Sequence, residues 1–193
     1  MSPRPTLAHV RRPAILAAAA QVISERGVIG TRISDVAERA GTSAPNVLYW
    51  FASKDELLGE ALEFADDRFY AELEEELERL DGARARLERI IELWPADGDY
   101  ETVLWMELWL HALRDPGSRE TRERLDRRWR ETIAGVVREG QASGEFRDAD
   151  ADDFALVLGA LMDGFAIQIA LGDPAVGLER VREHCLTMVQ ERL

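Results

Sequence analysis

The sequence predicts an all-helical protein with two domains. Apolar residues recur at the 3.6-residue period of an α-helix along most of the chain, and runs of β-branched residues are few. The net charge of −13 is unevenly divided, because residues 1–54 carry seven basic and three acidic side chains while the remainder carries 17 basic and 34 acidic ones. We therefore expect a small basic domain at the N-terminus, suited to phosphates, followed by a larger acidic domain.

The N-terminal segment divides into an arm and a first helix. Residues 1–10 contain Pro3 and Pro5 and few apolar side chains, so we expect a flexible arm. Residues 12–26 then carry an apolar stripe that ends at Gly27, where a helix can stop with a positive φ. This stretch imitates a signal peptide in composition, but the helical pattern continues through it without a cleavage region, which favours the first helix of a domain.

Two short helices joined by a tight turn follow in residues 31–54. Thr31 and Ser43 are good N-caps, and Gly41 stands where the first of the two helices would end. This is the pattern of a helix-turn-helix, whose second helix enters the major groove of DNA. An ordinary helical hairpin in a bundle is the alternative. The short second helix, its aromatic end and the basic residue that follows favour the DNA-binding interpretation.

The second helix has an apolar side and a side suited to DNA. We expect Val47, Leu48 and Phe51 to make its apolar contacts. Asn46 can pair with the edge of an adenine, and methyl groups such as that of Thr42 can touch thymine. The candidate DNA-binding residues are Thr31, Arg32, Thr42, Ser43, Ala44, Pro45, Asn46, Tyr49, Trp50 and Lys54.

A long helix is predicted after the helix-turn-helix. Ser53 and Glu56 form a capping box at its start, and the apolar period continues to about residue 80, so this helix joins the two domains. We place the DNA-binding domain at residues 11–56 and a second domain at residues 57–193. Further helices are predicted at 83–94, 100–114, 118–142, 151–171 and 175–192.

The second domain combines large aromatic residues with polar residues in otherwise apolar helices. Core filling accounts for part of this, but small-ligand cavities are also lined by rings, Met and a few polar groups. Glu107, His111, Asp163 and Gln168 are polar residues of this kind, and a bound ligand can satisfy such groups. The candidate pocket residues are Phe64, Trp94, Trp105, Met106, Trp109, Trp129, Met162, Phe165 and Gln168.

No catalytic or metal-binding constellation is recognisable. The three His residues are far apart, and the Asp-rich run at residues 148–153 lacks the Gly and Glu of a calcium loop. Cys185, the single cysteine, lies in an apolar helical pattern, which predicts a buried thiol and a reducing compartment. No apolar run approaches the ~20 residues of a membrane span. We expect a cytoplasmic protein without cofactor, metal or enzymatic activity.

Two sets of residues resemble a known family. The pattern I-x-x-V-A-x-x-A-G-x-S…Y-x-F-x-S-K-D-E-L, from Ile33 to Leu57, resembles the DNA-binding domain of TetR-family transcriptional regulators, and the match covers residues 12–60. In the second domain, three segments are similar to the subgroup that contains the choline and glycine-betaine regulators. These segments are Trp105 with Trp109, Arg128 with Trp129, and Leu161 to Phe165.

The resemblance implies a nine-helix, two-domain fold, a homodimer and a small-molecule effector. Effector binding would tilt the helix after Lys54 and move the two recognition helices out of register with half-sites ~34–36 Å apart. Many members carry Tyr where Leu48 stands, so Tyr49 becomes the candidate for that contact. By analogy, the phosphate contacts would be Thr31, Ser43, Tyr49 and Lys54, and the residues nearest base edges Ala44, Pro45 and Asn46. The dimer interface would comprise Phe154, Leu158, Leu161, Ile169, Val181, His184 and Met188 of the last two helices.

These features predict a ligand-responsive transcriptional repressor that binds a palindromic operator as a homodimer. A helical-bundle enzyme is one alternative, which a turnover assay would detect. A helical protein–protein adaptor is another, and it would show no salt-dependent DNA binding. Within gene regulation, an activator or a regulator without a small ligand stays open.

Overall fold

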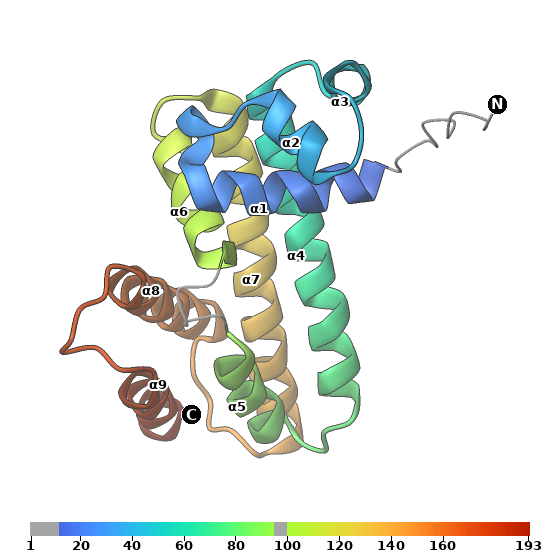
Figure 1. Cartoon of the computed structure of the whole chain (residues 1–193). Coiled ribbons are helices and arrows are strands. Elements are labelled where there is room, and N and C mark those ends of the chain that lie inside the picture. The colour runs from blue at the N-terminus through green and yellow to red at the C-terminus, as the bar shows by residue number, and fades with distance from the viewer. Residues whose placement is uncertain (1–11, 95–99) are drawn as a thin grey trace. The chain divides into compact units, whose positions relative to one another are not determined.

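The computed structural model describes residues 12–94 and 100–193, and within these ranges the chain forms nine α-helices and no strand (Figure 1). The predicted all-helical fold class is confirmed. The candidate arm at residues 1–10 lies outside the described residues. The helices are α1 (Arg12–Gly30), α2 (Ile33–Arg39), α3 (Ala44–Trp50), α4 (Lys54–Glu78), α5 (Ala83–Leu93), α6 (Tyr100–Ala112), α7 (Pro116–Ser143), α8 (Ala151–Ala170) and α9 (Leu178–Arg192).

The described residues divide into two compact units. The first unit comprises the residues up to Asp67 together with Val103–Thr121, so it holds α1, α2 and α3, most of α4 and most of α6. The second unit comprises Arg68–Thr102 and Arg122–Leu193 and holds α5, α8, α9 and most of α7. The long helix α4 contributes to both units, as the sequence suggests for this helix.

The helix ends follow local signals in the sequence. The backbone of α1 leaves helical geometry at Gly27, with a φ of 69° and a ψ of 165°, where the sequence predicts a stop. Glu56 caps the start of α4, since its N–H donates to Ser53 Oγ at 3.0 Å and its carboxylate accepts the N–H of Ala52. The start of α2 differs from the prediction, because Arg32 and not Thr31 occupies the N-cap position.

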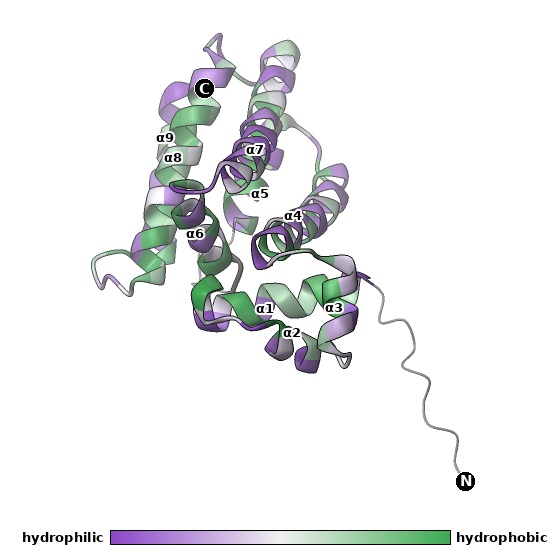
Figure 2. Ribbon diagram, turned by 90° about the horizontal axis from the view of Figure 1, so that it is seen from above, coloured by the Kyte–Doolittle hydropathy of each residue, from purple (hydrophilic) through white to green (hydrophobic). Residues whose placement is uncertain are grey.

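A small apolar core organises the first unit. Ile15 and Val22 of α1, Val36 of α2 and Val47 of α3 are each at most 1% exposed. In Figure 2, α1 is green over most of its length, as expected for a helix whose alanines and branched side chains are covered. Helix α1 packs on α2, and α2 packs on α3. The short α3 is thus anchored to this core through its buried side, which carries Val47.

The core of the second unit is built from α5, α7, α8 and α9. Leu87, Ile133, Phe154 and Leu158 are fully buried in it. Cys185 of α9 is 1% exposed, and this burial raises the pKa of its thiol to about 11. The prediction of a buried thiol is confirmed.

Part of the predicted dimer interface lies in this core. Phe154 and Leu158 are 0% exposed and Val181 is 2% exposed, so these side chains cannot contact a partner chain. The sequence could not separate Phe154 and Leu158 from surface residues, because α8 is apolar on nearly all sides. Val181 lies in the amphipathic α9, on its buried side with Cys185 and Val189. The remaining residues of the predicted interface are partly buried or exposed: Leu161, Ile169, His184 and Met188.

Among the described helices, α8 is also the one that is long and apolar enough to cross a membrane by length and composition. Its side chains Phe154, Leu158 and Met162 are fully buried within the second unit. About a third of the apolar stretch of α8 is buried in this way, and a single helix of this length and composition also occurs in soluble proteins, so this feature does not indicate a membrane protein.

Candidate nucleic-acid interface

The turn between α2 and α3 depends on a glycine and a serine. Gly41 adopts a φ of 66°, which most side chains disfavour, and the N–H of Thr42 donates to the carbonyl of Ala37 at 2.8 Å. Ser43 is the N-cap of α3, and its Oγ accepts the N–H of Asn46 at 3.4 Å. The local sequence thus builds the helix-turn-helix geometry that it predicts.

The helix α3 has one buried side and a broad exposed side. Val47, together with the C-cap Phe51, is 0% exposed and anchors the helix. Tyr49 is 79% exposed and Trp50 39%, and their rings meet edge to face with centroids 5.3 Å apart. Leu48 is 54% exposed, so the expectation that it makes apolar core contacts is wrong. Val47 and Phe51 suffice to hold so short a helix, and Leu48 belongs to the exposed side.

The side chains best suited to reading base edges lie together at the N-terminal end of α3. The Nδ2 of Asn46 donates to Oγ1 of Thr42 at 2.9 Å, which orients the amide next to the turn. Ala44 is partly exposed and Pro45 is exposed. This cluster brings an amide, a hydroxyl and small apolar groups to the helix end that a helix-turn-helix inserts into the major groove.

Two of the predicted phosphate contacts have internal partners. Thr31 is 2% exposed, and its Oγ1 donates to the carbonyl of Gly27 at 2.8 Å. Lys54 is partly buried, and its Nζ donates to the carbonyl of Val28 at 3.2 Å and to that of Thr31 at 2.9 Å. The burial of Thr31 contradicts a contact with DNA. Most of the hydrogen-bonding capacity of Lys54 goes to the chain between α1 and α2.

Exposed ion pairs connect the arginines of this region. Arg39 pairs with Glu25 at 2.7 Å, and this hydrogen bond holds the pKa of Glu25 below its ordinary value. Arg26 pairs with Asp35 at 2.7 Å, and Arg32 is exposed at the N-cap of α2. Because exposed pairs contribute little free energy, phosphates can compete for these guanidinium groups.

The predicted pocket residues are shared between the two units. The first unit holds Phe64, Trp105, Met106 and Trp109, and the second holds Trp94, Trp129, Met162, Phe165 and Gln168. In the first unit, the rings of Trp105 and Trp109 have centroids 6.5 Å apart. In the second unit, the ring centroids of Trp129 and Phe69 are 6.1 Å apart. Their common participation in one pocket stays a prediction.

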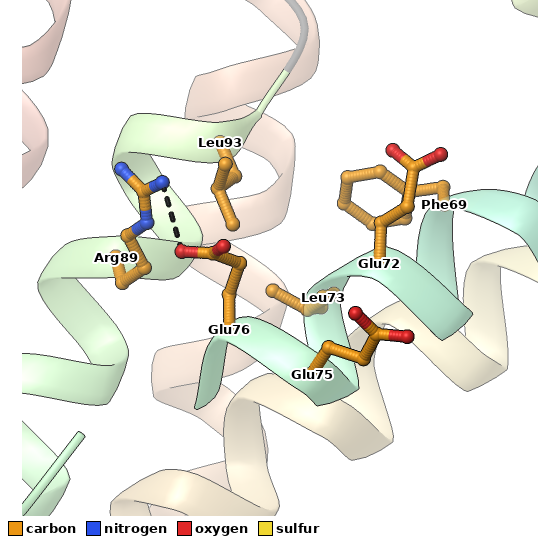
Figure 3. A pocket seen from close by; sticks show the side chains of 7 residues that line it. All are labelled: Phe69, Glu72, Leu73, Glu75, Glu76, Arg89 and Leu93. Atoms are coloured by element: carbon orange, nitrogen blue, oxygen red, sulfur yellow. Dashed lines mark hydrogen bonds and ion pairs between the residues drawn. The ribbon is translucent and has the colours of Figure 1, made fainter. Parts of the chain in front are cut away.

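A hollow of about 270 Å³ opens between α4 and α5 in the second unit (Figure 3). Its apolar lining comprises Phe69, Leu73 and Leu93, and an ion pair of 3.1 Å joins Glu76 to Arg89 at its rim. Glu72 and Glu75 complete the lining. None of the predicted pocket residues lines this hollow, because the sequence prediction concentrated on Trp and Met rather than on the acidic half of α4.

Two carboxyl groups of the second unit have unusual surroundings. Burial and the negative charge of Asp126 raise the pKa of Asp163 to about 7. Burial also raises the pKa of Asp126, although Arg122 lies 3.3 Å from its carboxylate. Gln168 does not behave as predicted, since its side chain is exposed and donates to the carbonyl of Gly164 at 3.3 Å. It is therefore not a buried polar group that needs a ligand.

Comparisons with known proteins identify the family. A model described as bacterial regulatory proteins of the tetR family matches residues 15–61. A second, described as BetI-type transcriptional repressor, C-terminal, matches residues 83–193, more than half of the chain. The chain belongs to the TetR family of transcriptional regulators. The resemblance of its second part to the choline and betaine regulators is confirmed as well.

Several relatives of this TetR-family protein match along nearly the whole chain. The HTH-type transcriptional regulator BetI of Burkholderia mallei is 26% identical, covering 89% of this chain and 88% of its own length, and that of Agrobacterium fabrum is 27% identical over 91% and 84%. A transcriptional regulator from Saccharomonospora viridis, solved in complex with choline, is 34% identical with a TM-score of 0.83 and covers 93% of this chain and 95% of its own. A TetR-family regulator from Rhodococcus sp. is 31% identical with a TM-score of 0.83, over 95% and 98%.

Membership in the TetR family decides between the functional alternatives. Regulators of this family bind operator DNA through the helix-turn-helix and respond to small molecules, and they are not enzymes. The predicted class, a ligand-responsive transcriptional regulator of repressor type, is confirmed at this level. The adaptor and enzyme alternatives are not favoured.

Proposed function

We propose that this TetR-family regulator acts in the cytoplasm as a homodimer that represses transcription at a palindromic operator, and that a small organic cation releases it. In this proposal residues 11–56 read DNA and residues 57–193 bind the effector and the partner chain. The observation that carries DNA reading is the exposure of Tyr49 and Pro45 on a helix that Val47 anchors on its other side. The proposed DNA contacts are Arg32, Thr42, Ser43, Ala44, Pro45, Asn46, Leu48, Tyr49 and Trp50.

The proposed dimer interface is the exposed side of α8 and α9. Val157 is 41% exposed although it lies in an apolar helix whose opposite side is the core. Phe165 stacks on His184 of α9, with ring centroids 6.1 Å apart and an interplanar angle of 9°. Leu161 and Met188 are partly buried next to this core. The exposed apolar side chains Leu156 and Val157 of α8, next to the partly buried Leu161 and Met188, support pairing with a second copy of the chain.

The proposed effector is a cation with a quaternary ammonium group. The relative solved with choline supports this class. Trp129 offers an aromatic face of the kind that attracts such cations, and Asp126 and Asp163, on the same two helices as Trp129 and Met162, offer negative charge. A bound cation would stabilise the charged form of Asp163, whose pKa is otherwise raised to about 7.

The test begins with selection of bound DNA from random sequence. The proposal expects an inverted repeat whose affinity falls as the salt concentration rises, because arginine contacts with phosphates displace counterions. Choline and glycine betaine are then added to the complex, with uncharged 3,3-dimethylbutanol as the matched control for choline. Release by choline and not by the control supports the cationic effector. Absence of salt-dependent binding to any selected DNA would contradict the proposed function.

A further inference from the structure

The chain between the break in α1 and the start of α2 is tied to α6. Because α1 leaves helical geometry at Gly27, the N–H of Val28 needs a partner from elsewhere in the fold. That partner is Glu107 of α6, whose Oε2 accepts the N–H at 3.0 Å. The two residues are 79 positions apart in the sequence and belong to the same compact unit.

Gly27 makes this contact possible in two ways. Its φ of 69° is a conformation that side chains rarely adopt. A Cβ atom at this position would also lie 2.9 Å from Oε1 of Glu107, closer than such contacts occur. The glycine therefore permits both the turn in the backbone and the approach of the carboxylate.

The same segment is also held by α4. Lys54, the first residue of α4, donates from Nζ to the carbonyls of Val28 and Thr31, at 3.2 and 2.9 Å. The side chain of Thr31 is buried and donates to the carbonyl of Gly27. The carboxylate of Glu107 on α6 and the ammonium group of Lys54 on α4 thus both form hydrogen bonds with the backbone of the few residues that lead into α2 and α3.

This contact gives Glu107 a different partner from the one the sequence suggests. As a polar residue in an apolar helix, it is expected to need a partner, for which a ligand is one candidate, and the group that it binds is the backbone of the DNA-reading part of the unit. One turn later on α6, Nδ1 of His111 lies 3.8 Å from Oδ1 of Asp55 in the first turn of α4. Polar groups at two successive turns of α6 therefore face the DNA-reading part of the chain.

We infer that Glu107 is a positioning residue that sets the orientation of α2 and α3 relative to α6 and α4, and thereby the half-site spacing that the protein accepts. The inference rests on the proposed binding of a dimer to two half-sites. The residues from Gly27 to Thr31 form the end of α1 and lead into α2, so loss of the Glu107 contact lets α2 and α3, together with the part of α1 that packs on α2, shift relative to α6. A reading unit that can shift fits several half-site spacings, whereas a fixed one fits one.

The experiment measures the affinity of the full chain for the selected operator and for versions with one base pair added or removed between the half-sites. The variants are Glu107→Ala, Glu107→Gln, whose amide oxygen can still accept the N–H, and Glu107→Asp, which keeps the charge but is one methylene shorter. The exposed carboxylate of Glu120, in the same unit, provides the control Glu120→Ala. Hydrogen exchange of the Val28 amide is followed in parallel.

We expect Glu107→Ala and Glu107→Asp to lose about tenfold of the preference for the natural spacing, as the loss of one charge-assisted hydrogen bond predicts. Exchange at the Val28 amide should accelerate by a similar factor, while Glu107→Gln and Glu120→Ala retain both properties. If Glu107→Ala does not fold, Glu107→Asp carries the test.

Two results would overturn the inference. One is an unchanged spacing preference in both Glu107→Ala and Glu107→Asp, while the unmodified protein discriminates the spacings. The other is an equal loss of affinity for every spacing and for a single half-site, which is the signature of a merely destabilised fold. If the unmodified protein binds no selected DNA in a salt-dependent way, it is the proposed function that fails, and accelerated exchange at Val28 in Glu107→Ala would still test the contact itself.

Discussion

The helices α3 and α8 both carry many apolar and aromatic residues, but they distribute them differently. In α3 the fully buried position is Val47, and Tyr49 is 79% exposed. In α8 Leu158 is fully buried while its neighbour Val157 is 41% exposed. The short helix α3 is anchored by Val47 and exposes the rings of Tyr49 and Trp50, which we propose to contact DNA. The long helix packs one apolar side into its own core, and its other apolar side is the one that we propose for the dimer interface.

The largest effect is expected on the buried side of α8. Replacing Phe154 by Ala leaves a cavity in the core of the second unit, since this ring is 0% exposed. The free energy of unfolding, measured by urea denaturation, should fall by about 3–5 kcal/mol. If Phe154 lay on a dimer surface instead, the change would weaken association and leave the stability of the protomer nearly unchanged.

The buried carboxyl group of α8 should make stability depend on pH. Burial raises the pKa of Asp163 from 3.8 to about 7, so the folded state disfavours the charged form. At low pH the carboxyl group is protonated in both the folded and the unfolded state, and its titration then has no effect on stability. As the pH rises from about 4 to about 7, the unfolded state ionises more readily than the folded state, so the free energy of unfolding falls. Relative to Asp163→Asn, the unmodified protein should lose on the order of 2–4 kcal/mol over this range. Parallel pH curves for the two proteins would refute the assignment.

The exposed side of α8 should govern association rather than folding. Val157→Lys places a charge on the proposed dimer interface, and burial of an unpaired charge weakens such interfaces by about 3 kcal/mol, or roughly 100-fold. Sedimentation should therefore show protomers at concentrations where the unmodified protein is dimeric, with an unchanged thermal transition of the dissociated chain. Ala142→Lys, on an exposed position of α7 and therefore outside the proposed interface, is the control and should stay dimeric.

The smallest of these effects belongs to α3. Tyr49→Ala removes an exposed ring, so we expect operator affinity to fall about tenfold while the stability changes by no more than about 0.5 kcal/mol. Val47→Ala, on the buried side of the same helix, should instead destabilise the first unit by about 1 kcal/mol. Operator affinity is measured by titration and stability by thermal denaturation. If Tyr49→Ala and Val47→Ala lose affinity and stability in the same proportion, the division of α3 into a DNA-binding side and a buried side is wrong.

Much of the fold could be predicted because its signals are local. Gly27, Gly41 and Ser43 act on the backbone within a few residues, and the predicted helix ends agree with the structure to within four residues. The proposed DNA-binding helix α3 could be recognised for the same reason, from its N-cap Ser43 and its rings Tyr49 and Trp50. The exposure of Leu48 was missed because an apolar side chain next to Val47 is expected to share its burial.

The rest depends on contacts between distant segments, which a periodic pattern does not contain. A helix that is apolar on nearly all sides cannot be divided into core and surface from its own residues, so Phe154 and Leu158 of α8 were placed on the wrong side. Glu107 carries a visible signal, a charge within an apolar helix, but its partner is a backbone N–H 79 residues earlier. An internal partner of this kind also explains why Thr31 differs from its predicted role. Lys54 has two internal acceptors as well, and its contact with a phosphate stays a prediction.

Hydroxyl-radical footprinting of side chains, with and without the selected operator, tests the comparison most directly. The account predicts that Leu48, Tyr49 and Trp50 become protected when DNA is added. It also predicts that Val157 and Met188 become protected as the protein concentration rises, before any DNA is present. Equal labelling of Tyr49 in free and DNA-bound protein would contradict the claim that α3 meets the double helix.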